Sequence, residues 1–114
     1  MDVQSSCETV SVDDATVQLA FDLSGSDVGY LIISKPANGR SGPDEFFGSD
    51  HYVEVKDQLF GHYGGLETLE VLNDSSFALR LVNDVPSVGR DLSVTTAQPM
   101  TSEVLSHLRS LERS

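Results

Sequence analysis

An alternation of apolar and polar residues with a period of two is the feature that most constrains how this chain can fold. In residues 16–23 the apolar side chains all fall on one face of a strand: Val17, Leu19, Phe21 and Leu23. The same period recurs in residues 51–57, 69–71, 77–82 and 92–96. Residues 28–34 are apolar on both faces, which predicts a central strand, whereas Val10 and Val12 predict a short edge strand. The pattern therefore predicts a protein made mainly of strands.

The period changes near the C-terminus. After Pro99, Thr101 can cap a helix whose apolar residues gather on one face at the 3.6-residue period: Val104, Leu105, Leu108 and Leu111. Many strands followed by one amphipathic helix indicate an α+β fold. We predict a single domain over residues 1–114, with an antiparallel sheet of about six strands and the helix packed on one face of the sheet.

The charge of the chain excludes several classes of partner. Its 114 residues include 18 acids and 7 bases, and the formal net charge is −11. Phosphate backbones and anionic lipid surfaces attract clustered Lys and Arg, and here the bases are scattered. We therefore expect no nucleic-acid or membrane partner. The first residues carry no basic leader, and no apolar run in the sequence approaches membrane length, so we expect the chain in the cytoplasm.

The spacing of reactive residues does not favour an enzyme. His51 and His62 are too far apart to form a paired metal-ligand motif, and surface or loop positions are the simpler interpretation. The glycines of residues 61–65 lack the Lys and Ser or Thr of a phosphate-binding loop, and predict a turn with positive backbone dihedrals. Cys7 is the single cysteine, which excludes an internal disulfide. We expect no enzyme, metal or cofactor; the alternative is a small acidic sheet enzyme or regulatory domain that uses carboxylates near residues 50–70.

The most distinctive block of the sequence is a strand, a short insert, a glycine turn and an alternating hairpin over residues 51–82. The positions that carry the pattern are Tyr52, Glu54, Asp57, Gln58, Tyr63, Gly64 and Glu67. This block resembles the tenth immunity-protein family of bacterial polymorphic toxin systems, and the resemblance spans residues 28 to 111. It implies a non-enzymatic protein that binds and blocks a cognate toxin domain.

The acidic charge favours a basic toxin, for example a nuclease, because opposite charges accelerate encounter and allow a blocker to occupy a phosphate groove. The same charge could instead reflect a high-salt cytoplasm. The matched residues could serve as scaffold or as contact: Asp57 and Gln58 could cap a turn, Gly64 and Gly65 could supply its special dihedrals, and Tyr63 could pack on the sheet.

Two surfaces are candidates for toxin contact. One is the face of Tyr52, Glu54 and Lys56, extended by Glu70 if the strands pair; the other is the loop of Phe46 and Phe47 with Asp44 and Glu45. The predicted partner-binding residues are Tyr52, Glu54, Asp57, Gln58, Tyr63, Glu67, Phe46 and Phe47. An exposed first or last strand could also pair across a homodimer.

Overall fold

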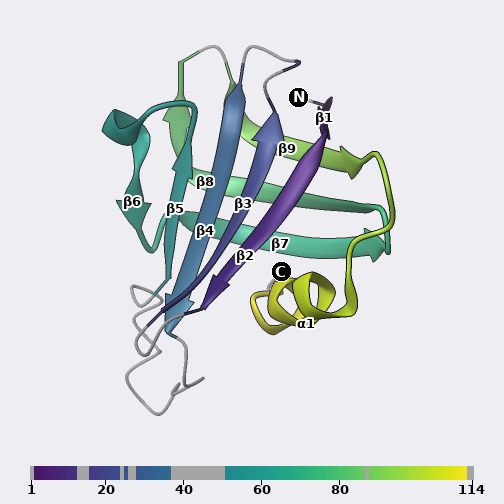
Figure 1. Ribbon diagram of the computed structural model, residues 1–114. Coiled ribbons are helices and arrows are strands. Elements are labelled where there is room, and N and C mark those ends of the chain that lie inside the picture. Colours follow the sequence, from purple (N-terminus) through teal and green to yellow (C-terminus); the bar gives the residue numbers. More distant parts are fainter. Residues whose placement is uncertain are drawn as a thin grey trace.

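The described part of the chain is mostly β-structure (Figure 1). The structure, a computed structural model, describes residues 2–12, 16–23, 25, 28–36, 51–86 and 88–112, with side chains omitted at positions 36, 58 and 63. The strands are β1 (Asp2–Ser5), β2 (Cys7–Val12), β3 (Thr16–Leu23), β4 (Gly29–Pro36), β5 (Tyr52–Val55), β6 (His62–Tyr63), β7 (Leu66–Asn73), β8 (Ser76–Val85) and β9 (Gly89–Thr96). A 3₁₀ turn, η2 (Gln58–Phe60), follows β5, and helix α1 (Ser102–Ser110) follows β9.

These strands form two sheets, so the prediction of a single sheet of about six strands is wrong. Sheet I has the order β1-β9-β8-β7, and sheet II has the order β2-β3-β4-β5-β6. The strands of one sheet run across those of the other (Figure 1). The pair β1 and β9 is parallel, whereas every other pair is antiparallel among the described strands. The broad α+β class is confirmed. Periodicity identifies which residues share a face, but it does not reveal where the chain leaves one sheet for the other.

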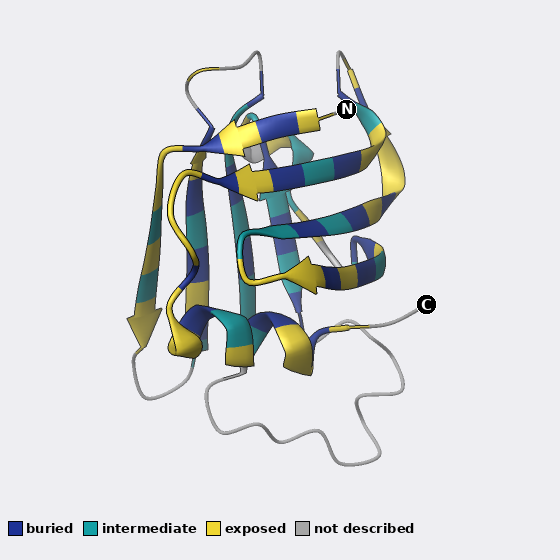
Figure 2. Cartoon of the chain, turned by 90° about the vertical axis from the view of Figure 1, so that its right-hand side faces the viewer, coloured by how far each residue is buried: buried dark blue, intermediate teal, exposed yellow. Residues whose placement is uncertain are grey.

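The core lies between the two sheets. The alternation that the sequence shows in residues 16–23 is confirmed, because the four apolar side chains of β3 are buried and its polar ones face outward. Figure 2 shows the same alternation along the other strands. Phe21 of sheet II meets Phe77 of sheet I with ring centroids 5.0 Å apart. This aromatic pair joins the two layers at the centre of the core.

Helix α1 does not pack on the face of a sheet, which corrects the predicted position. It contacts β7 and β2, the outer strands of the two sheets, and closes one open side of the sandwich (Figure 1). Its predicted cap is confirmed: Thr101 Oγ1 accepts a hydrogen bond from the Val104 N–H at 3.2 Å. Val104, Leu108 and Leu111 are buried as expected. A short amphipathic helix thus fills a gap that two crossed sheets leave open.

The C-terminal end of α1 is tied to both sheets. The Glu112 carboxylate accepts a hydrogen bond from the Val71 N–H at 2.8 Å, which satisfies one amide on the free edge of β7. Lys35 Nζ, at the end of β4, donates to Ser110 Oγ. A covered and capped edge is less open to pairing with another strand.

His51 is buried at 1% exposure in the irregular segment directly before β5, so the predicted surface position is wrong and the predicted loop position is confirmed. Its Nε2 accepts a hydrogen bond from the Leu66 N–H at 3.1 Å, and its carbonyl accepts one from the Gly64 N–H at 2.9 Å. These bonds hold the segment where the chain passes from β6 in sheet II to β7 in sheet I. His51 therefore has a structural role at the crossing between the layers.

Candidate partner-binding site

The outer face of sheet II carries the tyrosines and the glutamate that the sequence singled out. Ile32 pairs with Glu54 and Ser34 pairs with Tyr52 in the register of β4 and β5. Tyr30, Tyr52 and Glu54 are half-buried and turn away from the core, because they alternate with the buried Leu31, Ile33, Val53 and Val55. We call this trio the Tyr–Glu–Tyr cluster.

Hydrogen bonds organise the Tyr–Glu–Tyr cluster. Tyr52 Oη donates to Glu54 Oε1 at 2.7 Å, and Tyr30 Oη donates to Glu54 Oε2. Each carboxylate oxygen thus accepts one hydrogen bond from a tyrosine hydroxyl, and its second lone pair can accept a hydrogen bond from another donor. The two tyrosines fix the orientation of a negative charge on an exposed sheet, which is a preorganised arrangement for binding a cation.

The surroundings of Tyr30 favour its neutral form. Burial of the phenol, its hydrogen bond to Glu54 and the negative charges of Glu54 and Asp57 together raise the pKa of Tyr30 to about 12. At neutral pH this phenol is therefore a hydrogen-bond donor. The cluster carries the charge of its carboxylate alone.

This pKa predicts a loss of stability in alkaline solution. Because the folded pKa of Tyr30 lies above the unfolded value of about 10, the contribution is fully present below about pH 10 and is lost as the pH rises toward 12. An ultraviolet titration should therefore show a late-ionising tyrosine that is absent in Tyr30→Phe. In Glu54→Gln this ionisation should occur at lower pH, since the negative charge beside the phenol is gone. An unchanged titration in both variants would contradict the assignment.

A tight corner follows β5 beside the cluster. Lys56 has a φ of +73°, and the Asp57 N–H donates to the Val55 carbonyl at 2.7 Å, which is the hydrogen bond of a γ-turn with positive φ. Asp57 Oδ1 then accepts from the Leu59 N–H at 3.0 Å, so the predicted capping role of Asp57 is confirmed. Leu59 is 81% exposed at the tip of η2. The turn that follows β5 thus presents an exposed apolar side chain.

Replacing Lys56 with glycine is expected to stabilise the fold by about 1 kcal/mol. A non-glycine residue in this conformation is strained, and glycine adopts positive φ without a steric cost. Lys56→Ala is the matched control, since it removes the same side chain but keeps the strain. Urea unfolding measures both; equal stability of the two variants would show that the corner is not strained.

Glycines of the turn leave space for the Tyr52 ring to pack against the backbone. A Cβ placed on Gly61 would lie 1.8 Å from Tyr52 Oη, so this ring lies directly over the glycine. The predicted positive dihedral of the glycine turn is confirmed at Gly64, with a φ of +66°. A Cβ on Gly65 would lie 2.7 Å from Val53 Cγ1, so the special property of Gly65 is close packing. The glycine turn therefore supports the cluster.

The structure separates other predicted site residues from this face. Glu67 lies on β7 of sheet I and pairs with Arg90, and Glu70 lies on the same strand. The expected extension of the patch by Glu70 is therefore wrong, because β5 and β7 belong to different sheets. For Gln58 and Tyr63 the structure describes the backbone alone, and Phe46 and Phe47, with Asp44 and Glu45, lie outside the described residues.

The structure adds to this face and its adjoining turn two residues that the sequence pattern did not indicate. Tyr30 joins the cluster through β4, and the exposed Leu59 lies in η2, the turn that follows β5. The outward position of Tyr30 could be read from its alternation with Leu31, but its contact with Glu54 depends on the register of two strands separated by a long connection. No periodic signal marks Leu59.

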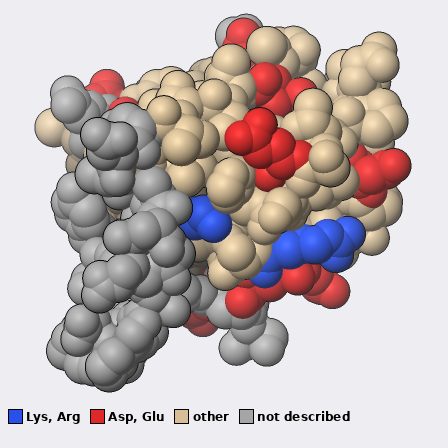
Figure 3. Space-filling view, turned by 60° about the horizontal axis from the view of Figure 1, so that its bottom comes forward, with Lys and Arg blue, Asp and Glu red and all other residues tan. Residues whose placement is uncertain are grey.

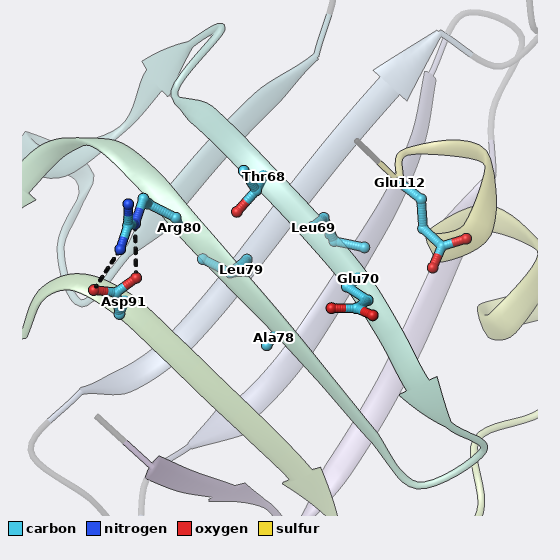
Figure 4. Close-up of a pocket in the computed structure, with 8 residues that line it drawn as sticks. All are labelled: Thr68, Leu69, Glu70, Ala78, Leu79, Arg80, Asp91 and Glu112. Carbon is cyan, nitrogen blue, oxygen red and sulfur yellow. Dashed lines mark hydrogen bonds and ion pairs between the residues drawn. The ribbon is translucent and has the colours of Figure 1, made fainter. Parts of the chain in front are cut away.

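A hollow of about 640 Å³ lies on the outer face of sheet I (Figure 4). Arg80 Nε bonds to Asp91 Oδ1 at 2.8 Å, and this contact holds the pKa of the Asp91 carboxyl below its usual range. Glu112, at the other end, already accepts from the Val71 amide. Most charged groups of this hollow are thus paired with groups of the chain itself, and they offer less to a partner than the Tyr–Glu–Tyr cluster does.

The described carboxylates of residues 50–70 are divided between β5 and the corner that follows it and β7 of the other sheet. Glu54 bonds to tyrosines, Asp57 caps η2 and Glu67 pairs with Arg90. Within the described ranges, no group of three or more His, Cys, Asp or Glu side chains is arranged to hold a metal ion. On the face shown in Figure 3, acidic groups lie at several separate places. No helix among the described residues is long and apolar enough to span a membrane.

Comparisons with known proteins add no assignment: no protein-family model matches the chain, and no curated protein gives a significant match.

Proposed function

We propose that this protein is an immunity protein that binds a basic bacterial toxin domain and blocks its active or binding surface. The observation that carries the proposal is the Tyr–Glu–Tyr cluster on the outer face of sheet II, where two tyrosines orient the Glu54 carboxylate toward solvent. Tyrosines at the centre of an exposed face are typical anchors of protein–protein interfaces.

The size of the face supports a protein partner. A specific interface needs about 800 Å² from each side, which a shallow sheet surface can supply and a small pocket cannot. The resemblance of residues 28 to 111 to the tenth immunity-protein family points to a toxin as that partner. The net charge of −11 favours a toxin that is basic, such as a nuclease.

The alternative, a small acidic enzyme or regulatory domain using carboxylates near residues 50–70, has less support. General acid–base chemistry needs two titratable groups within reach of one substrate. Of the four carboxylates that the structure describes in that range, Glu54, Asp57 and Glu67 have separate bonding partners, and Glu67 and Glu70 lie on the other sheet. A binding role requires no such convergence.

The proposal is tested by co-expressing the chain with the toxin domain encoded beside its gene. We expect restored growth and a stable complex whose dissociation constant rises with ionic strength, because salt screens the attraction between the acidic chain and a basic toxin. Absence of rescue together with absence of a complex would overturn the proposal. A complex that is insensitive to salt would contradict the basic character of the partner.

A further inference from the structure

The turn that follows β5 carries the most exposed of the large apolar side chains that the structure describes. Leu59 in η2 is 81% exposed, whereas the other exposed large apolar side chains reach 47% to 58%. Its neighbour Phe60 packs against the hydrophobic core. Leu59 therefore adds little to the stability of the fold, and its apolar surface is available to a partner. We call residues 56–61 the Leu59 turn.

Hydrogen bonds hold the Leu59 turn in one shape. The Leu59 N–H donates to Asp57 Oδ1 at 3.0 Å, and the Phe60 N–H donates to the Asp57 carbonyl at 2.9 Å. At the start of the turn, Lys56 has a φ of +73°, which is strained for a residue other than glycine. Strained backbone of this kind gathers at binding sites, where the surrounding structure fixes it. Binding through such a turn costs little conformational entropy, because its backbone is already ordered.

Both ends of the Leu59 turn contact the Tyr–Glu–Tyr cluster. The Lys56 N–H donates to the Tyr30 carbonyl at 3.2 Å. Gly61, at the other end, lies so close to Tyr52 that a Cβ on this glycine would be 1.8 Å from Tyr52 Oη. The turn is therefore continuous with the surface that we propose for the toxin.

The turn and the cluster together carry more negative than positive charge. Burial, the hydrogen bond to Glu54 and the charges of Glu54 and Asp57 raise the pKa of Tyr30 to about 12, so both carboxylates lie within electrostatic reach of its hydroxyl. Lys56 is the single cation of residues 52–61. A complementary partner surface therefore combines an apolar pocket with basic groups on its rim.

We propose that Leu59 is an anchor of the interface and inserts into an apolar pocket with a basic rim on the bound toxin. Lys56 is a positioning residue, because its strained conformation holds the turn in the shape that presents Leu59. This inference rests on the proposed function, and it names the apolar contact that accompanies the charge of Glu54.

Leu59→Ala and Leu72→Ala test the anchor, because each variant shortens one exposed leucine of the chain. Calorimetric titration with the toxin domain encoded beside the gene should show about tenfold weaker binding for Leu59→Ala. Leu72, on β7 of sheet I, is the matched control, and its replacement should leave the affinity unchanged. Both leucines are exposed, so the urea midpoint of each variant should stay that of the unchanged chain. Equal affinities of the two variants would overturn the inference.

Methyl resonances of the unchanged chain show the contact without any substitution. A soluble gadolinium chelate should broaden the methyl signals of both Leu59 and Leu72 in the free protein, since both side chains are exposed. In the toxin complex the Leu59 signals should be protected from the chelate, whereas those of Leu72 should remain broadened. Leu59 signals that remain broadened in the complex would overturn the inference.

Two variants of Lys56 separate the strained backbone from the side chain, because Lys56→Gly and Lys56→Ala both remove the ammonium. Glycine also relieves the strain and gives the turn more backbone freedom. Lys56→Gly should therefore bind the toxin about threefold more weakly than Lys56→Ala, although its fold is more stable. Equal binding by the two variants would show that Lys56 does not position the anchor.

The outcomes separate this inference from the proposed function. If the chain neutralises the toxin but Leu59→Ala binds as tightly as Leu72→Ala, the anchor is wrong and the immunity role stands. If the unchanged chain gives neither rescue nor a complex, the immunity role is wrong, and the anchor, which needs that partner, is wrong with it. If the chain alone sediments as a dimer that Leu59→Ala dissociates, the occupant is a second copy, and the inference is overturned.

Discussion

Replacing Phe77 with alanine is expected to lower the free energy of unfolding by about 4 kcal/mol. The ring is fully buried at 0% exposure and meets Phe21 of the other sheet with centroids 5.0 Å apart. Its removal leaves a cavity at the junction of the two layers and deletes a contact between them. A domain of this size has a free energy of unfolding of about 5–15 kcal/mol, so a large part of the stability would be lost.

Val82→Ala is the control for this experiment, because Val82 lies on the same strand at 47% exposure. We expect it to change the stability by no more than about 0.5 kcal/mol. Urea unfolding of both variants gives the comparison. A loss below about 1 kcal/mol for Phe77→Ala would mean that the sheets do not depend on this aromatic contact.

The strands of this fold were largely readable from the sequence, but the pairing of the sheets was not. The alternation in β3 and the cap at Thr101 are confirmed because both depend on residues that are near one another in the chain. The parallel pairing of β1 with β9 joins residues such as Val3 and Val94, which no local pattern connects. Likewise, the apolar stripe of the helix shows that one of its sides is buried, but it does not show which part of the protein that side packs against. The predicted position on a sheet face therefore could not be derived from the stripe.

In the candidate site, too, the arrangement within one strand could be predicted, whereas the pairing between strands could not. Tyr52 and Glu54 were predicted to share an outward face, and the structure confirms it, since two residues of one strand at a spacing of two must do so. Glu70 was expected beside them on the assumption that its strand pairs with β5, and it lies on the other sheet. The buried position of His51 was also missed, because its acceptor role depends on the Leu66 amide fifteen positions away in the chain.

Charge reversal at Glu54 is the second change with a large expected effect. Glu54→Lys replaces the oriented carboxylate with a cation, removes the acceptor of both tyrosine hydroxyls and repels a basic partner. A charge at the centre of an interface contributes about 2 kcal/mol or more, so we expect the dissociation constant for the toxin domain to rise about thirtyfold. Glu54→Gln keeps an acceptor oxygen and should give a smaller loss.

Glu70→Lys is the matched control, because it changes the net charge by the same amount on the outer face of sheet I. Urea unfolding of each variant establishes that both are folded. Calorimetric titration of the toxin domain into the two variants tests directly whether sheet II binds a basic toxin domain. We expect the affinity to fall about thirtyfold for Glu54→Lys and less than about threefold for Glu70→Lys. Equal affinities of the two folded variants for the toxin would contradict this expectation.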